Sequence, residues 1–134
     1  MKTEWPCYLA GRALQPNADL QVRDKYRGEV VAQVALADAC LVDQAIAAAH
    51  GARATMAAFP PDARREVLGH CAARFHERRE ELARLLCIEA GKPIRDARGE
   101  VERLVDTFRI AAEEATRIGG EVLELQRTPR TRGY

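Results

Sequence analysis

Residues 79–120 read REELARLLCIEAGKPIRDARGEVERLVDTFRIAAEEATRIGG, and this stretch decides the fold. Apolar residues recur three and four positions apart on both sides of Gly91-Lys92-Pro93, which is the spacing of helices that bury one face. A glycine followed two residues later by a proline is a usual helix end. The stretch therefore predicts one helix from about Arg79 to Gly91. A longer helix is expected from about Pro93 to Ile118, before Gly119-Gly120.

Two further helices are expected upstream of this stretch. Asp38 is a suitable N-cap for an alanine-rich helix that follows it and runs to about Phe59. Pro60-Pro61 then breaks the chain and begins the next helix, because a proline in the first helical turn loses no hydrogen bond. The sequence leaves open whether that helix continues into the following one or is kinked within His76–Arg79. Residues 38–118 thus predict four helices.

The first 36 residues read as strands and turns. Trp5–Arg12 is a short apolar run that ends in a turn. Asp19–Asp24 alternates polar and apolar residues, residues 25–28 form a turn, and Glu29–Ala35 reads as a second strand, so the pair predicts a β-hairpin. Glu121–Leu125 predicts a short strand after the helices. The predicted fold class is therefore mainly α, with an N-terminal β-hairpin and a short C-terminal strand.

The composition is that of an ordinary soluble globular protein: of 134 residues, 47% are hydrophobic and 31% are charged. A formal net charge of +1 creates no long-range field that would attract nucleic acid or an anionic membrane. The sequence has neither a secretory signal nor a run of about 18 apolar residues. Scattered cysteines favour a reduced, cytoplasmic protein over a disulfide scaffold. They are Cys7, Cys40, Cys71 and Cys87.

The predicted helices carry more apolar surface than this chain can cover by itself. A helix of ~26 residues is ~39 Å long at ~1.5 Å per residue. A compact chain of this length has a radius of gyration of ~14 Å, and hence a diameter of ~36 Å. The longest helix would therefore project beyond a small bundle, and one hairpin cannot cover four apolar helix faces. We expect these faces to pack against further protein, in the same polypeptide or in a partner.

No catalytic or metal-binding set is evident in the sequence. His70 and Cys71 are adjacent, so their side chains point about 100° apart on a helix, and the spacing of His70, Cys71 and His76 does not suit a helical zinc site. Gly91-Lys92-Pro93 is not a phosphate loop, because Leu86 replaces the earlier glycine and proline replaces the Ser or Thr. No G-x-G-x-x-G occurs. We assign no catalytic, cofactor-binding or metal-binding residue.

Short segments spread over nearly the whole chain follow the order of one enzyme family. Arg79–Ala83 followed by Glu89–Pro93 fits the pattern R-x-E-L-A…E-x-G-K-P. Asp24–Val30 fits a strand–turn–strand, with Arg27 where threonine is commoner. Further matches are Tyr8–Gly11, Gly99–Val101, Asp106–Arg109 and Ala111–Ala115. From about Tyr8 to Tyr134, the chain thereby resembles the aldehyde dehydrogenase superfamily.

The resemblance implies that residues 1–134 are part of the N-terminal domain of an α/β, Rossmann-like enzyme. Strands then lie in 1–36, four helices in 38–118, and a strand and truncated oligomerisation arm in 121–134. The resemblance also implies oxidation of a small-molecule aldehyde to an acid with NAD or NADP, after attack by a cysteine. The family's catalytic motifs lie beyond residue 134, so none of the four cysteines is assigned as the nucleophile. The chain alone is expected to be inactive, and to need the remainder of the enzyme or a second copy to cover its helices.

Arg103 is the one residue with an implied direct role. In family members that act on phosphorylated or phosphonate aldehydes, an arginine at the similar position, after E-V-x, helps to bind the anion, for which a planar guanidinium is well suited. The alternative is a surface salt bridge to Glu100. For the chain as a whole, the alternative functions are a non-catalytic helical binding or assembly module, and a nucleic-acid binder with steeply salt-dependent affinity.

Overall fold

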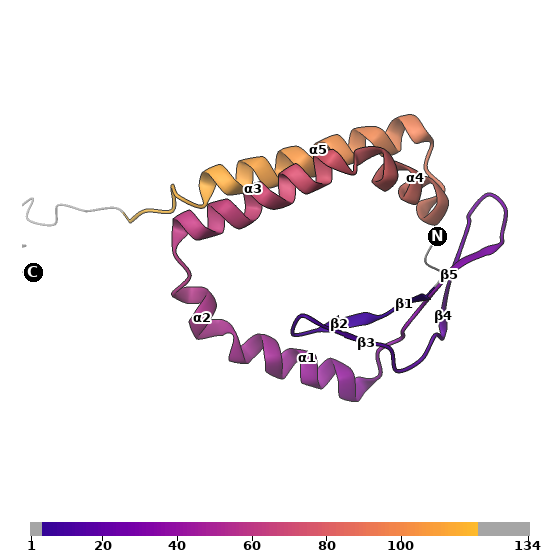
Figure 1. Cartoon of the computed structure of the whole chain (residues 1–134), viewed down its shortest axis with the longest axis horizontal. Helices are drawn as coiled ribbons and strands as arrows, with labels where there is room; N and C mark the ends of the chain where they lie inside the picture. Colours follow the sequence, from indigo (N-terminus) through magenta and orange to yellow (C-terminus); the bar gives the residue numbers. More distant parts are fainter. Residues whose placement is uncertain (1–3, 121–134) are drawn as a thin grey trace, which may run out of the picture.

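The computed structural model describes residues 4–120, and Figure 1 shows strands at the N-terminal end followed by helices arranged in an open ring. The predicted fold class, mainly α with N-terminal strands, is confirmed for this part. The predicted strand Glu121–Leu125 and the tail after it lie outside the described residues.

Three strands form a small mixed sheet in the order β1-β5-β4. β4 (Leu20–Arg23) and β5 (Val30–Val34) pair antiparallel, which confirms the predicted hairpin, and an irregularity lies between Val22 and Arg23. β1 (Glu4–Trp5) adds to the other edge of β5 in parallel. The sheet thus joins the first residues of the chain to a strand about thirty positions later, as the register Glu4 to Gln33 shows.

A second, separate hairpin pairs β2 (Cys7–Leu9) with β3 (Arg12–Leu14). Its turn is Ala10-Gly11, and both residues have positive φ, 49° and 78°. This conformation suits a two-residue hairpin, since it matches the twist of the flanking strands. The sequence predicted the strand and the turn, but β3 was not predicted.

The β4–β5 turn is closed by one aspartate. Asp24 accepts backbone hydrogen bonds at Oδ1 from the amides of Tyr26 at 2.8 Å and Arg27 at 2.9 Å. These two bonds stabilise the ionised carboxyl and lower the pKa of Asp24. Gly28 completes the turn with a φ of 76° and donates its amide to the Asp24 carbonyl at 2.8 Å. The turn is therefore fixed by local hydrogen bonds rather than by burial.

The alanine-rich segment forms two helices, α1 (Ala39–Gly51) and α2 (Arg53–Ala57), where the sequence predicted a single helix to about Phe59. The N-cap is confirmed, because Asp38 accepts a hydrogen bond from the Leu41 amide at 2.8 Å. The break follows Gly51, since glycine is a weak helix former. At the next residue, Ala52, the backbone has φ −76° and ψ −10°. The ring turns at this point in Figure 1.

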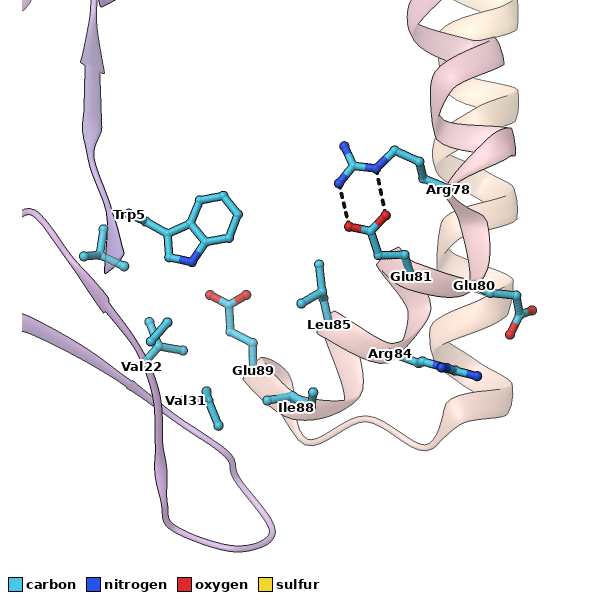
Figure 2. Close-up of a pocket in the computed structure, with 12 residues that line it drawn as sticks. Trp5, Val22, Val31, Arg78, Glu80, Glu81, Arg84, Leu85, Ile88 and Glu89 are labelled. Carbon is cyan, nitrogen blue, oxygen red and sulfur yellow. Dashed lines mark hydrogen bonds and ion pairs between the residues drawn. The ribbon is translucent and has the colours of Figure 1, made fainter. Parts of the chain in front are cut away.

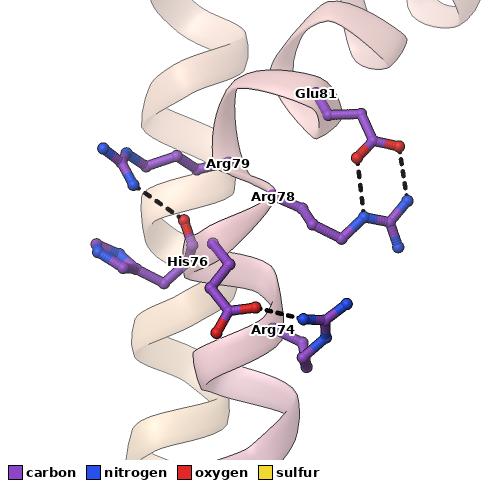
Figure 3. Close-up of polar contacts among 6 residues, drawn as sticks. Arg74, His76, Arg78, Arg79 and Glu81 are labelled. Carbon is purple, nitrogen blue, oxygen red and sulfur yellow. Dashed lines mark hydrogen bonds and ion pairs between the residues drawn. The ribbon is translucent and has the colours of Figure 1, made fainter.

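Three more helices form the opposite side of the ring: α3 (Pro61–Glu77), α4 (Arg79–Ala90) and α5 (Ile94–Glu114). The structure separates α3 from α4 at Arg78, whose φ of −96° and ψ of 13° are not helical. Figure 3 shows the polar contacts around this break. Arg79 donates to the His76 carbonyl at 3.1 Å, and Arg78 binds both carboxylate oxygens of Glu81, at 2.9 and 2.6 Å. The kinked alternative is therefore the correct one.

The helices meet through small side chains. Ala83 of α4 and Ala97 of α5 are fully buried, and Val101 is 2% exposed beside them. α3 and α5 are joined by Phe75 and Phe108, whose rings meet edge to face at a centroid distance of 4.9 Å. The fully packed part of the described chain is thus a thin seam between α3, α4 and α5.

The chain exposes far more surface than a compact protein of its length. The accessible area is 10819 Å², whereas the size relation for folded monomers gives about 7000 Å². Residues outside the described part would account for at most about 2700 Å², the value for a fully unfolded chain. The excess agrees with the expectation that the helix faces need further protein. In α1 no residue is buried, and Ile46 is 62% exposed.

Candidate functional site

A hollow of about 770 Å³ lies between α4 and the three-stranded sheet (Figure 2). Its walls are mostly apolar and come from both sides. The sheet contributes side chains from all three of its strands, and α4 contributes two large aliphatic residues from its second half. These apolar wall residues are Trp5, Val22, Val31, Ala32, Val34, Leu85 and Ile88.

Charged residues of α4 surround the hollow, and two of them are held by arginines. The Arg78 guanidinium binds Glu81 and lowers the pKa of its carboxyl. Arg98 of α5 binds Glu80 at 3.0 and 3.1 Å and lowers the pKa of that carboxyl as well. Glu89 forms no ion pair with any residue of the part between 4 and 120, and in Figure 2 its carboxylate points into the hollow.

The turn between α4 and α5 contacts the β4–β5 turn. Gly91 ends α4 in the left-handed conformation, with a φ of 69°. A Cβ on this glycine would lie 3.0 Å from the Cβ of Lys25 in the β4–β5 turn. In the same place, the Lys25 amide donates to the Ile88 carbonyl at 3.1 Å. A side chain at residue 91 would therefore crowd this contact, which joins the end of α4 to the β4–β5 turn.

Arg103 lies on α5 with its side chain 77% exposed. The surface salt bridge to Glu100 is present, at 3.7 Å from Arg103 Nη2 to Glu100 Oε1, although this distance is too long for a direct hydrogen bond. The same Oε1 atom is already bound by the Lys92 ammonium, and this hydrogen bond is the main reason that the pKa of Glu100 is lowered. Lys92 and Glu100 are also more buried than Arg103. Lys92 is therefore the main partner of Glu100, and the Arg103 guanidinium remains largely exposed.

Two further ion pairs lie on the surface at the C-terminal part of α5 and just after it. Helical spacing would also allow each of their arginines to reach Glu113, four positions away. In the structure Arg109 pairs with Asp106 at 3.4 Å, and Arg117 with Glu114 at 3.0 Å. Each arginine pairs instead with the acid three positions before it, where helical side chains also meet. These pairs are solvent-exposed and contribute little to stability.

Residues 4–120 contain no arrangement that performs aldehyde chemistry. The four cysteines are free thiols in separate elements, and the three histidines are exposed. No group of three or more metal-ligating side chains comes together in the part of the chain that the structure describes. The hollow does not fit NAD or NADP either, because the Glu89 carboxylate points into it and would repel a pyrophosphate, and no glycine-rich turn at a helix N-terminus lies there among the described residues.

Sequence reasoning did not identify the hollow or the Lys92–Glu100 pair. The residues around the hollow are ordinary apolar positions of a strand or helix, and nothing in their spacing shows that they face one another. Lys92 and Glu100 are eight residues apart and are separated by a helix start, so no spacing rule within one helix joins them.

Residues 4–120 thus combine a thin helical seam with a large apolar hollow. The chain belongs to the aldehyde dehydrogenase family, which matches residues 13–133. The resemblance seen in the sequence is thereby confirmed, and the chain is an N-terminal segment of this α/β fold.

Known proteins resemble this chain over nearly all of its length. The 3-sulfolactaldehyde dehydrogenase of Priestia megaterium is 36% identical over 94% of this chain, which corresponds to 26% of that protein. Aldehyde dehydrogenase 21 of Physcomitrella patens, solved with the reaction product succinate, superposes with a TM-score of 0.94 at 40% identity, over 99% of this chain and 28% of that one.

A third comparison adds a cofactor complex. The glyceraldehyde-3-phosphate dehydrogenase of Methanocaldococcus jannaschii, solved with NADP, has a TM-score of 0.78 and 34% identity over 81% of this chain and 24% of that one. The chain therefore spans about a quarter of the length of the proteins it matches. Within residues 4–120, no helix is both long and apolar enough to cross a membrane.

Proposed function

We propose that this chain forms the N-terminal scaffold of a cytoplasmic, NAD(P)-dependent aldehyde dehydrogenase that oxidises a small aldehyde to its acid. The observation that supports this most is the superposition at a TM-score of 0.94 on a quarter of a much longer aldehyde dehydrogenase. The packed helices α3, α4 and α5 form the framework of this scaffold. The nucleophile and the cofactor site belong to the remainder of such an enzyme. The chain by itself has no dehydrogenase activity.

The test compares the chain alone with the chain completed by a relative. The 134-residue chain is fused in frame to the part of the Priestia megaterium enzyme that follows the matched segment. We expect aldehyde-dependent formation of NADH or NADPH, read at 340 nm, with the fusion and none with the chain alone. Activity of the purified chain would contradict the proposal, and so would an inactive fusion that is folded and binds NAD(P).

We further propose that Arg103 favours aldehydes that carry a second, anionic group. Its guanidinium is exposed, and its only acidic neighbour among the described residues is bound by Lys92. The three proteins above are each described with such a group: the sulfonate of 3-sulfolactaldehyde, the second carboxylate of the bound product succinate, and the phosphate of glyceraldehyde-3-phosphate. A guanidinium fork binds each of them through charge-assisted hydrogen bonds.

Arg103→Ala in the fusion tests this second proposal. Loss of one or two charge-assisted hydrogen bonds should raise KM for an anionic aldehyde about 10- to 100-fold, with KM for a neutral aldehyde within about twofold. Arg109→Ala is the matched control, because Arg109 lies on the same helix and is also exposed, but has its own partner in Asp106. Equal effects of Arg103→Ala on both aldehydes would assign Arg103 to the surface alone.

A further inference from the structure

We propose that Lys92 is a positioning residue for substrate recognition: by binding Glu100, it keeps the Arg103 guanidinium available for the anionic group of an aldehyde. The inference deepens the proposed function and rests on it, because it presupposes that Arg103 binds such a group. It adds a residue that lies outside α5 and the way in which this residue acts. Lys92 acts through Glu100 and needs no contact with the aldehyde.

Lys92 and Arg103 approach the same atom. The Lys92 ammonium donates a hydrogen bond to Oε1 of Glu100, whereas Nη2 of Arg103 stays 3.7 Å from that oxygen. The exposed fractions of the three side chains follow the same order: 33% for Glu100, 38% for Lys92 and 77% for Arg103. A direct, charge-assisted hydrogen bond outweighs a longer and more hydrated ion pair. Glu100 is therefore held by the lysine rather than by the arginine.

The backbone around Lys92 is fixed on both sides. Gly91 ends α4 in the left-handed conformation and donates its amide to the Cys87 carbonyl at 3.0 Å. Pro93 is the N-cap of α5, and its ring holds φ at −57°. Lys92 lies between these two residues, and Glu100 lies in the second turn of the helix that follows. The turn between α4 and α5 thus places the lysine where it reaches Glu100.

The side of Arg103 that faces Glu100 also has room for an anion. Long side chains of a helix lean towards its N-terminus, so Arg103 extends over the preceding turn, which holds Gly99 and Glu100. Gly99 has no side chain, and apart from the helix backbone and its chain neighbours no atom lies within 4 Å of the place that its Cβ would take. With Glu100 bound by Lys92, the guanidinium keeps its donors for a ligand, in a fork that suits a sulfonate, carboxylate or phosphate.

Loss of Lys92 would turn Glu100 into a competitor of the substrate. The freed carboxylate lies three positions before Arg103, where helical side chains meet, and would pair with the guanidinium. An anionic aldehyde would then have to displace this pair and would also approach an uncompensated negative charge. A neutral aldehyde would meet neither obstacle. The effect should therefore be confined to anionic aldehydes, and it should require Glu100.

Steady-state kinetics of the fusion test this with 3-sulfolactaldehyde and lactaldehyde, which differ only in the sulfonate. Lys92→Met should raise KM for 3-sulfolactaldehyde about three- to tenfold, with kcat and KM for lactaldehyde within about twofold. Lys92→Arg keeps a cation that can bind Glu100 and should retain the parent KM. Arg98→Met is the matched control, because it also removes an exposed cation but frees Glu80 of α4 instead of Glu100. It should leave KM for both aldehydes within about twofold.

The decisive comparison repeats Lys92→Met in a Glu100→Gln background. No carboxylate then competes for Arg103, so the lysine substitution should change KM for 3-sulfolactaldehyde by less than about twofold. An equal increase with and without Glu100 would show that Lys92 acts through its own charge, and it would overturn the inference. So would an unchanged KM in Lys92→Met, or equal increases for the two aldehydes. In each of these cases an Arg103→Ala variant that still discriminates between the aldehydes would leave the proposed role of Arg103 standing.

A measurement that needs no activity separates the inference from the proposed function. The pKa of the Glu100 carboxyl, lowered mainly by its hydrogen bond with Lys92, is followed by 13C NMR in the 134-residue chain. Arg103→Ala should raise this pKa at least about twice as much in the Lys92→Met variant as in the parent, because Arg103 has then become the partner of Glu100. Equal changes would overturn the inference even with an active fusion. An inactive fusion would overturn the proposed function instead, and the NMR comparison would then decide whether Lys92 keeps Glu100 from Arg103.

Discussion

The same substitution at two glycines should change stability in opposite directions. Gly91 has a φ of 69°, and a Cβ there would lie 3.0 Å from Lys25 Cβ. Gly99 lies inside α5, and nothing comes within 4 Å of the position that its Cβ would occupy. Alanine at 91 therefore meets both an unfavourable backbone conformation and a close atom, whereas alanine at 99 meets neither.

The magnitudes follow from these two environments. For Gly91→Ala, the left-handed conformation costs about 1–2 kcal/mol, and the reduced freedom of the unfolded chain offsets about 0.4–1 kcal/mol of this. Lys25 Cβ is attached to the backbone and cannot swing away, so relief of the contact strains the hydrogen bond from the Lys25 amide to Ile88, worth about 0.5–1.5 kcal/mol. The net destabilisation is about 1–2 kcal/mol. Gly99→Ala should stabilise by about 0.5–1 kcal/mol.

Thermal unfolding followed by circular dichroism at 222 nm measures both variants. A difference of about 2 kcal/mol between them corresponds to roughly 4–16 °C in Tm, with Gly91→Ala below the parent chain and Gly99→Ala above it. Equal shifts, or a Gly91→Ala variant as stable as the parent, would show that the α4 turn does not contact the β4–β5 turn as described.

Three further perturbations test the helical seam, its charges and the isolated chain. Ala72→Leu should lower the free energy of unfolding by about 1–3 kcal/mol, because Ala72 is only 4% exposed. Ala73→Leu, on the exposed side of the same helix, should change it by no more than about 0.5 kcal/mol. Equal midpoints of the two variants in urea unfolding would contradict the packing of Ala72. The pKa of Glu100 is lowered, so its pairing with Lys92 stabilises the fold above the ordinary Glu pKa and is lost as pH falls through the lowered value. Glu100→Gln should therefore reduce Tm at pH 7 and have little effect at pH 2–3, and a constant difference across this range would refute the pairing. In ultracentrifugation with DNA at 50 and 200 mM salt, we expect no binding, since the net charge is +1.

The helices of this chain were predictable because their signals are local. Asp38 as an N-cap, Gly91 as a helix end and Pro61 in a first turn each act within a few residues, and the structure has all three. The break after Gly51 was missed because the apolar stripe continues across it, while a single glycine in an alanine-rich helix is often tolerated.

The candidate site was predictable only in part because it depends on contacts between distant segments. Arg103 could be predicted as a site residue from the E-V-x pattern that precedes it. That its guanidinium is largely exposed could not be predicted, because Glu100 is bound mainly by Lys92, which lies before the start of the helix. The parallel pairing of β1 with β5 rests on strands of two and five residues whose sequences carry no information on register. Since Trp5 reaches the hollow only through that pairing, the hollow could not be predicted from sequence periodicity.

The thin core and the large hollow have a common cause: the small apolar side chains are buried, and the large ones are exposed. The residues buried in the described part are alanines and valines, and alanine contributes little apolar area, so the seam of α3, α4 and α5 fixes geometry more than it supplies free energy. The large apolar side chains, such as Trp5, Ile46 and Val67, are instead at least 44% exposed and can contribute only when another surface covers them. A partner present at 100 times its Kd would add about 2.7 kcal/mol to the free energy of unfolding. We therefore expect the stability of this segment to increase when another surface covers these side chains, as the proposed scaffold role implies.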